Sequence, residues 1–184
     1  FGYTVRDSYA EQGPVYHWIE IAPPAGGHGM ALESLSGIDD AYYWPLALPF
    51  SLPFYGTDYD EIAVSTNGTI SFEDAFMPLH GAPIPHESSV SAFIAHMWSD
   101  LVIDPGEIYV QDLGSLFIIE FYEIRTLGCE GPGTWQILLF DNGNILLQFK
   151  DTGFGCWADQ GGSATVGIQG SSTLGLGYSH WQPV

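Results

Sequence analysis

The chain has 184 residues, of which 46% are hydrophobic and 15% aromatic, so it can bury the core of a folded domain. Its 22 acidic and three basic residues give a net charge of −19, which argues against nucleic acids and anionic membranes as partners. No stretch approaches the ~20 consecutive apolar residues of a membrane-spanning helix, so no membrane insertion is expected. So many carboxylates suit a medium rich in salt, in acid, or in divalent cations such as calcium.

Short apolar segments rich in Val, Ile and aromatic residues alternate with turn residues along the whole chain, and no segment carries a sustained helical stripe. This pattern predicts an all-β fold, namely a two-sheet antiparallel β-sandwich of jelly-roll type with about 11 strands and little or no helix. In chain order the expected strands are residues 16–21, 41–46, 61–65, 70–72, 92–97, 108–111, 116–124, 135–140, 145–150, 164–169 and 176–179.

No internal repeat and no linker divides the apolar pattern, so residues 1–184 are expected to form one domain. Residues 1–13, FGYTVRDSYAEQG, precede the first expected strand and are the candidate for an N-terminal arm that extends from the fold. Because the chain begins with Phe1, we expect it to be a segment processed or cut from a longer precursor.

The segment LPFSLPFYGTDYDEIAVSTNGTISF, residues 48–72, is expected to form a wall of the sandwich. Pro49 and Pro53 cannot donate ladder hydrogen bonds, so the start of the segment belongs at a sheet edge or corner. Asn67-Gly68 is a hairpin turn signal because both turn positions favour positive φ. Three aromatic residues should close one end of the sandwich: Phe50, Phe54 and Tyr55.

Two apolar runs flank Asn142-Gly143 and predict a second hairpin. A two-residue loop at Asn142-Gly143 pairs Leu138 with Leu147. The face that carries Gln136, Leu138 and Phe140 with their partners on the second strand is the more apolar one and is expected to look into the core. The same register, continued outward, brings Cys129 opposite Cys156.

A disulfide between Cys129 and Cys156 would stabilise that hairpin by roughly 3 kcal/mol and would imply an oxidising compartment. The alternative is a pair of unrelated buried thiols. Together with the low content of charged residues, 14%, the expected disulfide favours a secreted, extracellular or cell-surface protein.

Several motifs in a fixed order resemble a known accessory module. LPFSLPFYGTDYDEIAVSTNGTISF is followed by FIAHMWSDL, then by GTWQILLFDNGNILLQFKD and GSATVGIQGSSTLGLGYS. Together they resemble a nidogen-like β-sandwich of large secreted bacterial and archaeal surface proteins and of subtilisin-like proteases. The resemblance implies a module without catalysis that serves adhesion, substrate attachment or assembly. The family often has two aspartates after the tryptophan, whereas this chain has Ser99 and then Asp100.

The residues themselves also argue against an enzyme. No Gly-x-Ser-x-Gly elbow, His-Glu-x-x-His motif or Cys-x-x-Cys motif occurs, and neither cysteine has a neighbouring histidine. Acidic residues are numerous, but nothing in the sequence singles out a catalytic pair. A cleft holding two carboxyls with perturbed pKa values would revive the enzyme hypothesis.

Calcium is the metal that the composition favours, because it binds several carboxylate and carbonyl oxygens. The candidate ligands lie in acidic loops without an EF-hand pattern: Asp100, Asp104, Asp39 and Asp40. The alternative is that these loops are only solvated. A carbohydrate site is the other binding hypothesis, because exposed aromatic rings stack on sugars. Its candidates are Tyr42, Trp44 and Tyr59, which are otherwise core or end-closing residues.

Three functions follow, in order of preference. The first is a non-catalytic accessory, adhesion or assembly module of a larger secreted or surface protein, whose partners are its other domains, neighbouring subunits, a carbohydrate or a surface polymer. The second is the repeating subunit of an extracellular filament, in which residues 1–13 leave their own domain and pair with a neighbour's sheet edge. The third is a calcium-dependent or carbohydrate-binding module.

Overall fold

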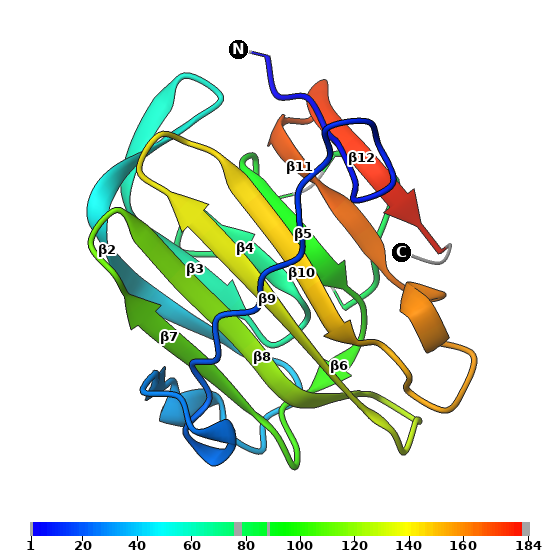
Figure 1. Ribbon diagram of the computed structural model, residues 1–184. Coiled ribbons are helices and arrows are strands. Elements are labelled where there is room, and N and C mark those ends of the chain that lie inside the picture. The colour runs from blue at the N-terminus through cyan, green and yellow to red at the C-terminus, as the bar shows by residue number, and fades with distance from the viewer. Residues whose placement is uncertain (1, 76–78, 88, 182–184) are drawn as a thin grey trace.

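The computed structural model describes residues 2–75, 79–87 and 89–181 and shows two antiparallel sheets packed face to face (Figure 1). Sheet A has the order β1-β7-β8-β9-β10, with β6 added beside β8, and sheet B has the order β12-β11-β5-β4-β3-β2. The strands of sheet A are β1 (Met30–Ala31), β6 (Leu101–Val102), β7 (Glu107–Asp112), β8 (Leu116–Thr126), β9 (Pro132–Phe140) and β10 (Ile145–Asp151). Those of sheet B are β2 (Tyr42–Phe54), β3 (Thr57–Ser65), β4 (Thr69–Ser71), β5 (Phe93–Trp98), β11 (Thr165–Ser171) and β12 (Leu174–His180).

The all-β sandwich predicted from the sequence is confirmed. Helix within the described ranges is limited to three short 3₁₀ turns: η1 (Pro23–Ala25), η2 (Glu33–Leu35) and η3 (Asp159–Gly161). The two-residue strands β1 and β6 were not predicted, because two residues carry no detectable alternation. Residues 16–21 were predicted as a strand but are extended without joining either sheet.

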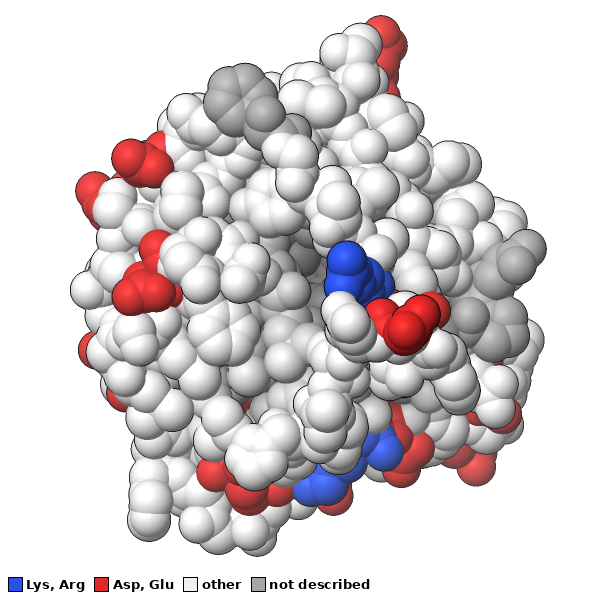
Figure 2. Space-filling view, turned by 45° about the horizontal axis from the view of Figure 1, so that its top comes forward, with Lys and Arg blue, Asp and Glu red and all other residues white. Residues whose placement is uncertain are grey.

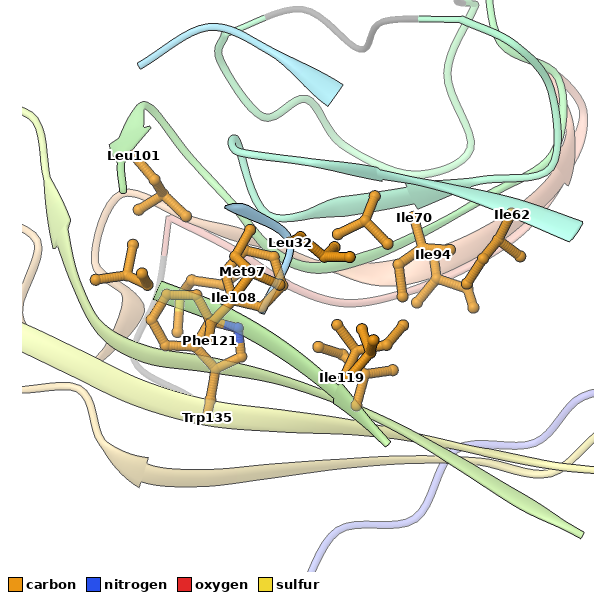
Figure 3. Close-up of a cluster of buried hydrophobic side chains, with 14 of the residues drawn as sticks. Leu32, Ile62, Ile70, Ile94, Met97, Leu101, Ile108, Ile119, Phe121 and Trp135 are labelled. Atoms are coloured by element: carbon orange, nitrogen blue, oxygen red, sulfur yellow. The ribbon is translucent and has the colours of Figure 1, made fainter. Parts of the chain in front are cut away.

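The core lies between the sheets and is built from one face of each (Figure 3). Ile62, Ile70 and Ile94 of sheet B face Ile119 and other apolar side chains of sheet A. Phe121 and Trp135 stack with ring centroids 5.2 Å apart, and both side chains are fully buried. Burial of this apolar surface is the main source of stability in a fold of this kind.

The proline-rich strand β2 is the edge of sheet B, as its sequence predicts. Beside the end of this strand the ring centroid of Phe54 lies 4.9 Å from that of Tyr55 and 4.4 Å from that of Phe72. Tyr3 joins this group, 5.5 Å from Phe54. The prediction that aromatic residues of this segment close one end of the sandwich is therefore consistent with the packing.

The β9–β10 hairpin has a register that differs by one residue from the predicted one. The Phe140 amide donates to Asn144 O and Gly143 takes φ +84°, so the loop has three residues rather than two. Leu138 therefore pairs with Leu146. The prediction that Gln136, Leu138 and Phe140 face the core was wrong. The core-facing residues of β9 are Trp135, Ile137 and Leu139, because the shifted register places them opposite the apolar residues of β10.

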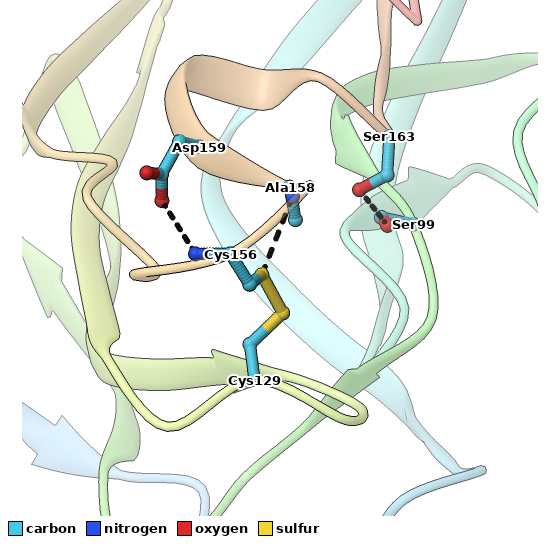
Figure 4. Close-up of a disulfide and its surroundings, with 6 residues drawn as sticks. All are labelled: Ser99, Cys129, Cys156, Ala158, Asp159 and Ser163. Atoms are coloured by element: carbon cyan, nitrogen blue, oxygen red, sulfur yellow. Dashed lines mark hydrogen bonds between the residues drawn. A yellow bond between two sulfur atoms is a disulfide. The ribbon is translucent and has the colours of Figure 1, made fainter.

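The disulfide is present although the register near the turn was mispredicted (Figure 4). A bulge between Phe149 and Asp151 adds one residue to β10. The residues that face each other past the bulge are therefore the same as those that a two-residue loop would have paired. Beyond the bulge Cys129 and Cys156 come opposite each other, with Cα atoms 5.8 Å apart. The predicted pairing is therefore confirmed.

An irregular segment covers the outer face of each sheet. The N-terminal strap, which we define as residues 14–22, runs across the strands of sheet A (Figure 1). Ile21 and Ala22 of this strap pack in a second apolar cluster with Ile118 and Leu138. On sheet B the loop between β4 and β5 forms a third cluster, in which Ala75, Ala82 and Ile84 pack against Val90, Phe93, Ala95 and Trp98.

Buried side-chain amides hold both covering segments. The His17 amide donates to Gln148 Oε1 and Gln148 Nε2 donates back to His17 O, each at 2.9 Å. Gln169 of sheet B holds His86 in the same two-way manner, at 2.7 and 3.0 Å. These glutamines supply the donor and acceptor that a neighbouring strand would supply, and so satisfy backbone groups that lie outside any ladder.

The strap contacts form a row across sheet A. Gln148 pairs in register with Gln136 of β9, and Gln136 pairs with Glu120 of β8. Gln136 Nε2 donates to Ile19 O at 2.5 Å, and the Ile21 amide donates to Glu120 Oε2 at 3.3 Å. Alternate residues of the extended strap thus meet successive strands of the sheet.

The expected N-terminal arm does not extend from the fold. Phe1 lies outside the described residues, but the Tyr3 hydroxyl is 3.1 Å from both Pro53 O and Gly143 O. The Tyr178 hydroxyl donates to Asp7 Oδ2 at 3.1 Å. Both contacts hold the part of this segment from Tyr3 to Asp7 on its own domain.

Replacing Gln148 with Leu should lower the free energy of unfolding by about 1–3 kcal/mol, because the His17 amide and carbonyl lose their partners. Urea denaturation measures the change. Gln111→Leu on β7, where the glutamine is only partly buried, is the matched control and should change stability by less than ~0.5 kcal/mol. Equal effects of the two variants would contradict the role given to Gln148.

Candidate functional site

Three of the predicted calcium ligands lie together at one end of the sandwich. One carboxylate oxygen from each of Asp39, Asp40 and Asp100 lies within 4.8 Å of the others. Asp39 and Asp40 precede β2, and Asp100 lies between β5 and β6. We call these three residues the aspartate cluster.

The turn between β3 and β4 positions the aspartate cluster. The Thr66 hydroxyl donates to Asp39 O and accepts from the Ala41 amide at 3.0 Å. Asn67 is fully buried, and its Nδ2 donates to Asp40 Oδ1 at 2.9 Å while its Oδ1 accepts from the Leu101 amide at 3.0 Å. The predicted Asn-Gly turn therefore ties the Asp39-Asp40 loop to the loop that carries Asp100.

The electrostatics of the cluster favour a bound cation. Burial raises the pKa of Asp39, and the neighbouring Asp40 and Asp100 carboxylates raise it further. Burial also raises the pKa of Asp100. The charge of His80 acts to lower this pKa, and the charge of Asp40 acts to raise it. Asp39 Oδ1 is buried without a hydrogen-bond partner. A hard cation would relieve this repulsion and supply the missing partner.

Asp104, the fourth predicted ligand, is not part of the cluster. Its Oδ2 is 2.6 Å from Nη2 of Arg125, and its backbone carbonyl accepts from Arg125 Nε at 2.5 Å. Val102 of β6 pairs with Arg125 of β8, so the chain beyond β6 leads Asp104 to this arginine and away from Asp100. Proximity in sequence therefore did not place Asp104 beside Asp100.

On the face shown in Figure 2, acidic side chains lie mainly around the rim and few side chains are basic. Two of the three basic residues of the chain are already ion-paired, Arg125 with Asp104 and Lys150 with Glu20, the latter at 2.9 Å. Neither of these pairs involves the aspartate cluster.

The three aromatic residues predicted to bind sugar do not form one platform. The Tyr59 ring lies 4.4 Å from that of Phe72 and packs against the core. The Tyr42 hydroxyl donates to Asp74 at 2.9 Å, and Trp44, two residues further along the same strand, is half-buried. Sugar binding by these residues stays a prediction.

Two carboxyls with diverging pKa values lie where the N-terminal strap meets sheet A: Glu20 belongs to the strap and Glu120 to β8. Burial raises the pKa of Glu120 to about 7, against the opposing hydrogen bond from Gln136. Burial also acts to raise the pKa of Glu20, but hydrogen bonds from Lys150, the Ala22 amide and Trp18 outweigh it and the net shift is downward. Glu120 lies on the outer face of sheet A and was not predicted from the sequence.

Diverging carboxyl pKa values are typical of acid–base enzymes, but the surroundings of Glu120 are not. Its side chain is 0% exposed beneath the backbone of the strap. The cleft of about 430 Å³ that the structure describes lies elsewhere, between β1, β7 and β2, and is lined by mostly apolar residues such as Met30, Leu48 and Phe117. Glu120 is therefore closed off from solvent by the strap.

His96 is a second buried titratable group that the sequence did not mark. Burial lowers the pKa of His96 to about 3. Its Nδ1 accepts a hydrogen bond from Trp135 Nε1 at 2.9 Å, and its ring lies 4.5 Å from that of Phe121. His96 is therefore a neutral part of the core.

The family comparison agrees with this architecture. The model of a family described as NIDO related matches residues 16–184. The chain belongs to the NIDO-related family. The match begins at Tyr16, so it includes most of the N-terminal strap as well as both sheets. No curated protein and no solved structure gives a significant match. Among the described residues, no helix is long and apolar enough to cross a membrane.

The buried imidazole predicts an acid sensitivity. The unfolded chain binds a proton at His96 below pH ~6.5, whereas the folded chain does not until about pH 3, so this group's contribution to stability falls as the pH falls through that range. His96→Asn keeps an acceptor for Trp135 but does not titrate. Between pH 6.5 and 4.5 the free energy of unfolding of the wild type should fall relative to that of the variant by about 1.4 kcal/mol per pH unit. Parallel pH profiles in urea denaturation would contradict this.

Proposed function

We propose that this NIDO-related domain is a non-catalytic accessory module that serves attachment or assembly of a larger secreted or surface protein. The family match over residues 16–184 is the observation that carries the proposal. The structure is consistent with it, because the most perturbed titratable side chains, Glu120 and His96, are buried in packing contacts.

An extracellular location is part of this proposal. The Cys129–Cys156 disulfide supports it, because disulfides persist in oxidising compartments. The partners proposed are other domains of the parent protein, neighbouring subunits or a neutral surface polymer, since a net charge of −19 disfavours polyanions. The filament alternative is less favoured, because Tyr3 and Asp7 contact their own domain rather than protruding from it.

A binding assay on intact cells tests the attachment function. Fluorescently labelled domain is added to source cells from which its own coding region has been deleted, and bound label is measured against concentration. We expect saturable binding that unlabelled domain displaces. An unrelated β-sandwich of similar size and net charge is the control and should not saturate. Absence of saturable binding, or turnover of a substrate by the purified domain, would count against the proposal.

We propose calcium binding at the aspartate cluster as a second function. Three carboxylate oxygens within 4.8 Å of one another and the unpartnered Asp39 Oδ1 support it. Calcium takes six to eight oxygen ligands at about 2.3–2.6 Å, so water or backbone carbonyls would complete the coordination. A cation there would join the loop before β2 to the loop after β5.

Calcium should raise the melting temperature, since a ligand bound only by the folded state adds about 2.7 kcal/mol at a hundredfold excess over its Kd. Asp100→Asn should abolish the rise, because it removes a carboxylate from the cluster. Asp104→Asn is the matched control and should keep the rise, because Asp104 pairs with Arg125. Differential scanning fluorimetry with and without millimolar calcium measures the effect. An unchanged wild-type melting temperature would rule the site out.

A further inference from the structure

The N-terminal strap is fastened to sheet A by a carboxyl group that has no access to solvent. Glu120 Oε2 accepts from the Ile21 amide at 3.3 Å and from Gln136 Nε2 at 2.8 Å. Glu120 Oε1 is buried and has no donor among the surrounding groups. A buried carboxylate with one unpaired oxygen and no cation in contact is costly, whereas the neutral acid is not.

A neighbouring carboxyl completes the arrangement. Glu20 of the strap is close enough for its charge to raise the pKa of Glu120. Glu20 Oε2 is the better candidate for the charge, because it accepts from Lys150 Nζ at 2.9 Å and from Trp18 Nε1 at 3.1 Å. The proton therefore belongs on Glu120, whose Oε1 accepts no hydrogen bond.

Lys150 is the cation that interacts with this pair, and it bonds Glu20 rather than Glu120. No titratable side chain of β9 faces Glu120, since its partner there is Gln136. Tyr109 of β7 pairs with Glu120 in register and is neutral at physiological pH. The titratable groups that interact electrostatically with Glu120 and Glu20 are Tyr16 of the strap, Tyr109 of β7, Tyr122 of β8 and Lys150 of β10.

We infer that the N-terminal strap is a proton-linked cover: a proton on Glu120 fastens residues 14–22 to the outer face of sheet A, and its loss loosens them. Loosening exposes the apolar side chains that Ile21 and Ala22 cover, among them Ile118 and Leu138. The domain thus carries an apolar surface whose accessibility rises with pH. This inference does not depend on the attachment function or on calcium.

The size of the pH effect follows from the thermodynamic linkage between proton binding at Glu120 and opening of the strap. When the strap opens, Glu120 meets water and its pKa returns to about 4.5, whereas in the closed state it is about 7. Opening therefore releases a proton between these values, and the opening equilibrium constant rises about tenfold per pH unit across that window. Above the upper value both states are ionised and the dependence levels off.

Hydrogen exchange of the His17 and Ile21 amides tests the inference, because both donate to side chains of sheet A. Protection factors, corrected for the intrinsic pH dependence of exchange, are measured from pH 5 to 8 by mass spectrometry. For the wild type we expect protection of the strap to fall about tenfold per pH unit up to neutrality and then to level off. Strand β5, in the middle of sheet B, should show no such fall.

Glu120→Gln is the decisive variant, because the amide has the shape of the protonated acid and cannot ionise. Its strap protection should be high and independent of pH. Glu61→Gln, which removes an exposed carboxylate on β3 of the opposite sheet, is the matched control and should behave as the wild type. Wild-type protection that does not change with pH would overturn the inference. So would a pH dependence that persists in Glu120→Gln, or failure of that variant to fold.

Discussion

The pairing of backbone groups that lie outside the two sheets is the constraint on which this structure depends. A sandwich buries one face of each sheet, and here irregular segments cover much of the other face as well. The backbone of such a segment has no neighbouring strand, and an unpaired buried amide or carbonyl is costly. Gln148 and Gln169 remove this cost by presenting an amide group that bonds in both directions, as a peptide group would.

This solution places polar side chains on faces that would otherwise be apolar, and the polar groups differ in what they can do. A glutamine is neutral at every pH, so Gln148 fastens its segment unconditionally. Glu120 occupies the equivalent place on β8, two strands from β10, and can ionise. The inferred proton-linked behaviour of the strap arises because Glu120 carries a carboxyl group, whereas Gln136 and Gln148 in the same row carry amides. The candidate cation ligands, by contrast, lie in loops at the end of the sheets rather than on their faces.

Much of the fold could be predicted because β-structure leaves a local record in the chain. Alternation, prolines at β2 and the Asn-Gly turns indicated the strands, the edge and the hairpins. The register of the β9–β10 hairpin could not be predicted, because a two-residue and a three-residue loop share the signal Asn142-Gly143. The Cys129–Cys156 pairing was nevertheless right, since the bulge in β10 offset the longer loop. Residues 16–21 alternate like a strand, but their partners are side chains rather than a ladder.

The sequence by itself determined the all-β class, most of the strands, the disulfide and the likeness to nidogen-like modules, because each depends on residue types at short or fixed spacing. Only the tertiary structure decided which acidic residues meet. Asp39 and Asp40 join Asp100 because the turn at Asn67 ties their loops together, while Asp104 turns to Arg125. The burial of Glu120 likewise depends on a strap about 100 residues away in sequence. Such contacts arise where chain segments cross, and crossing leaves no periodic signal in the sequence.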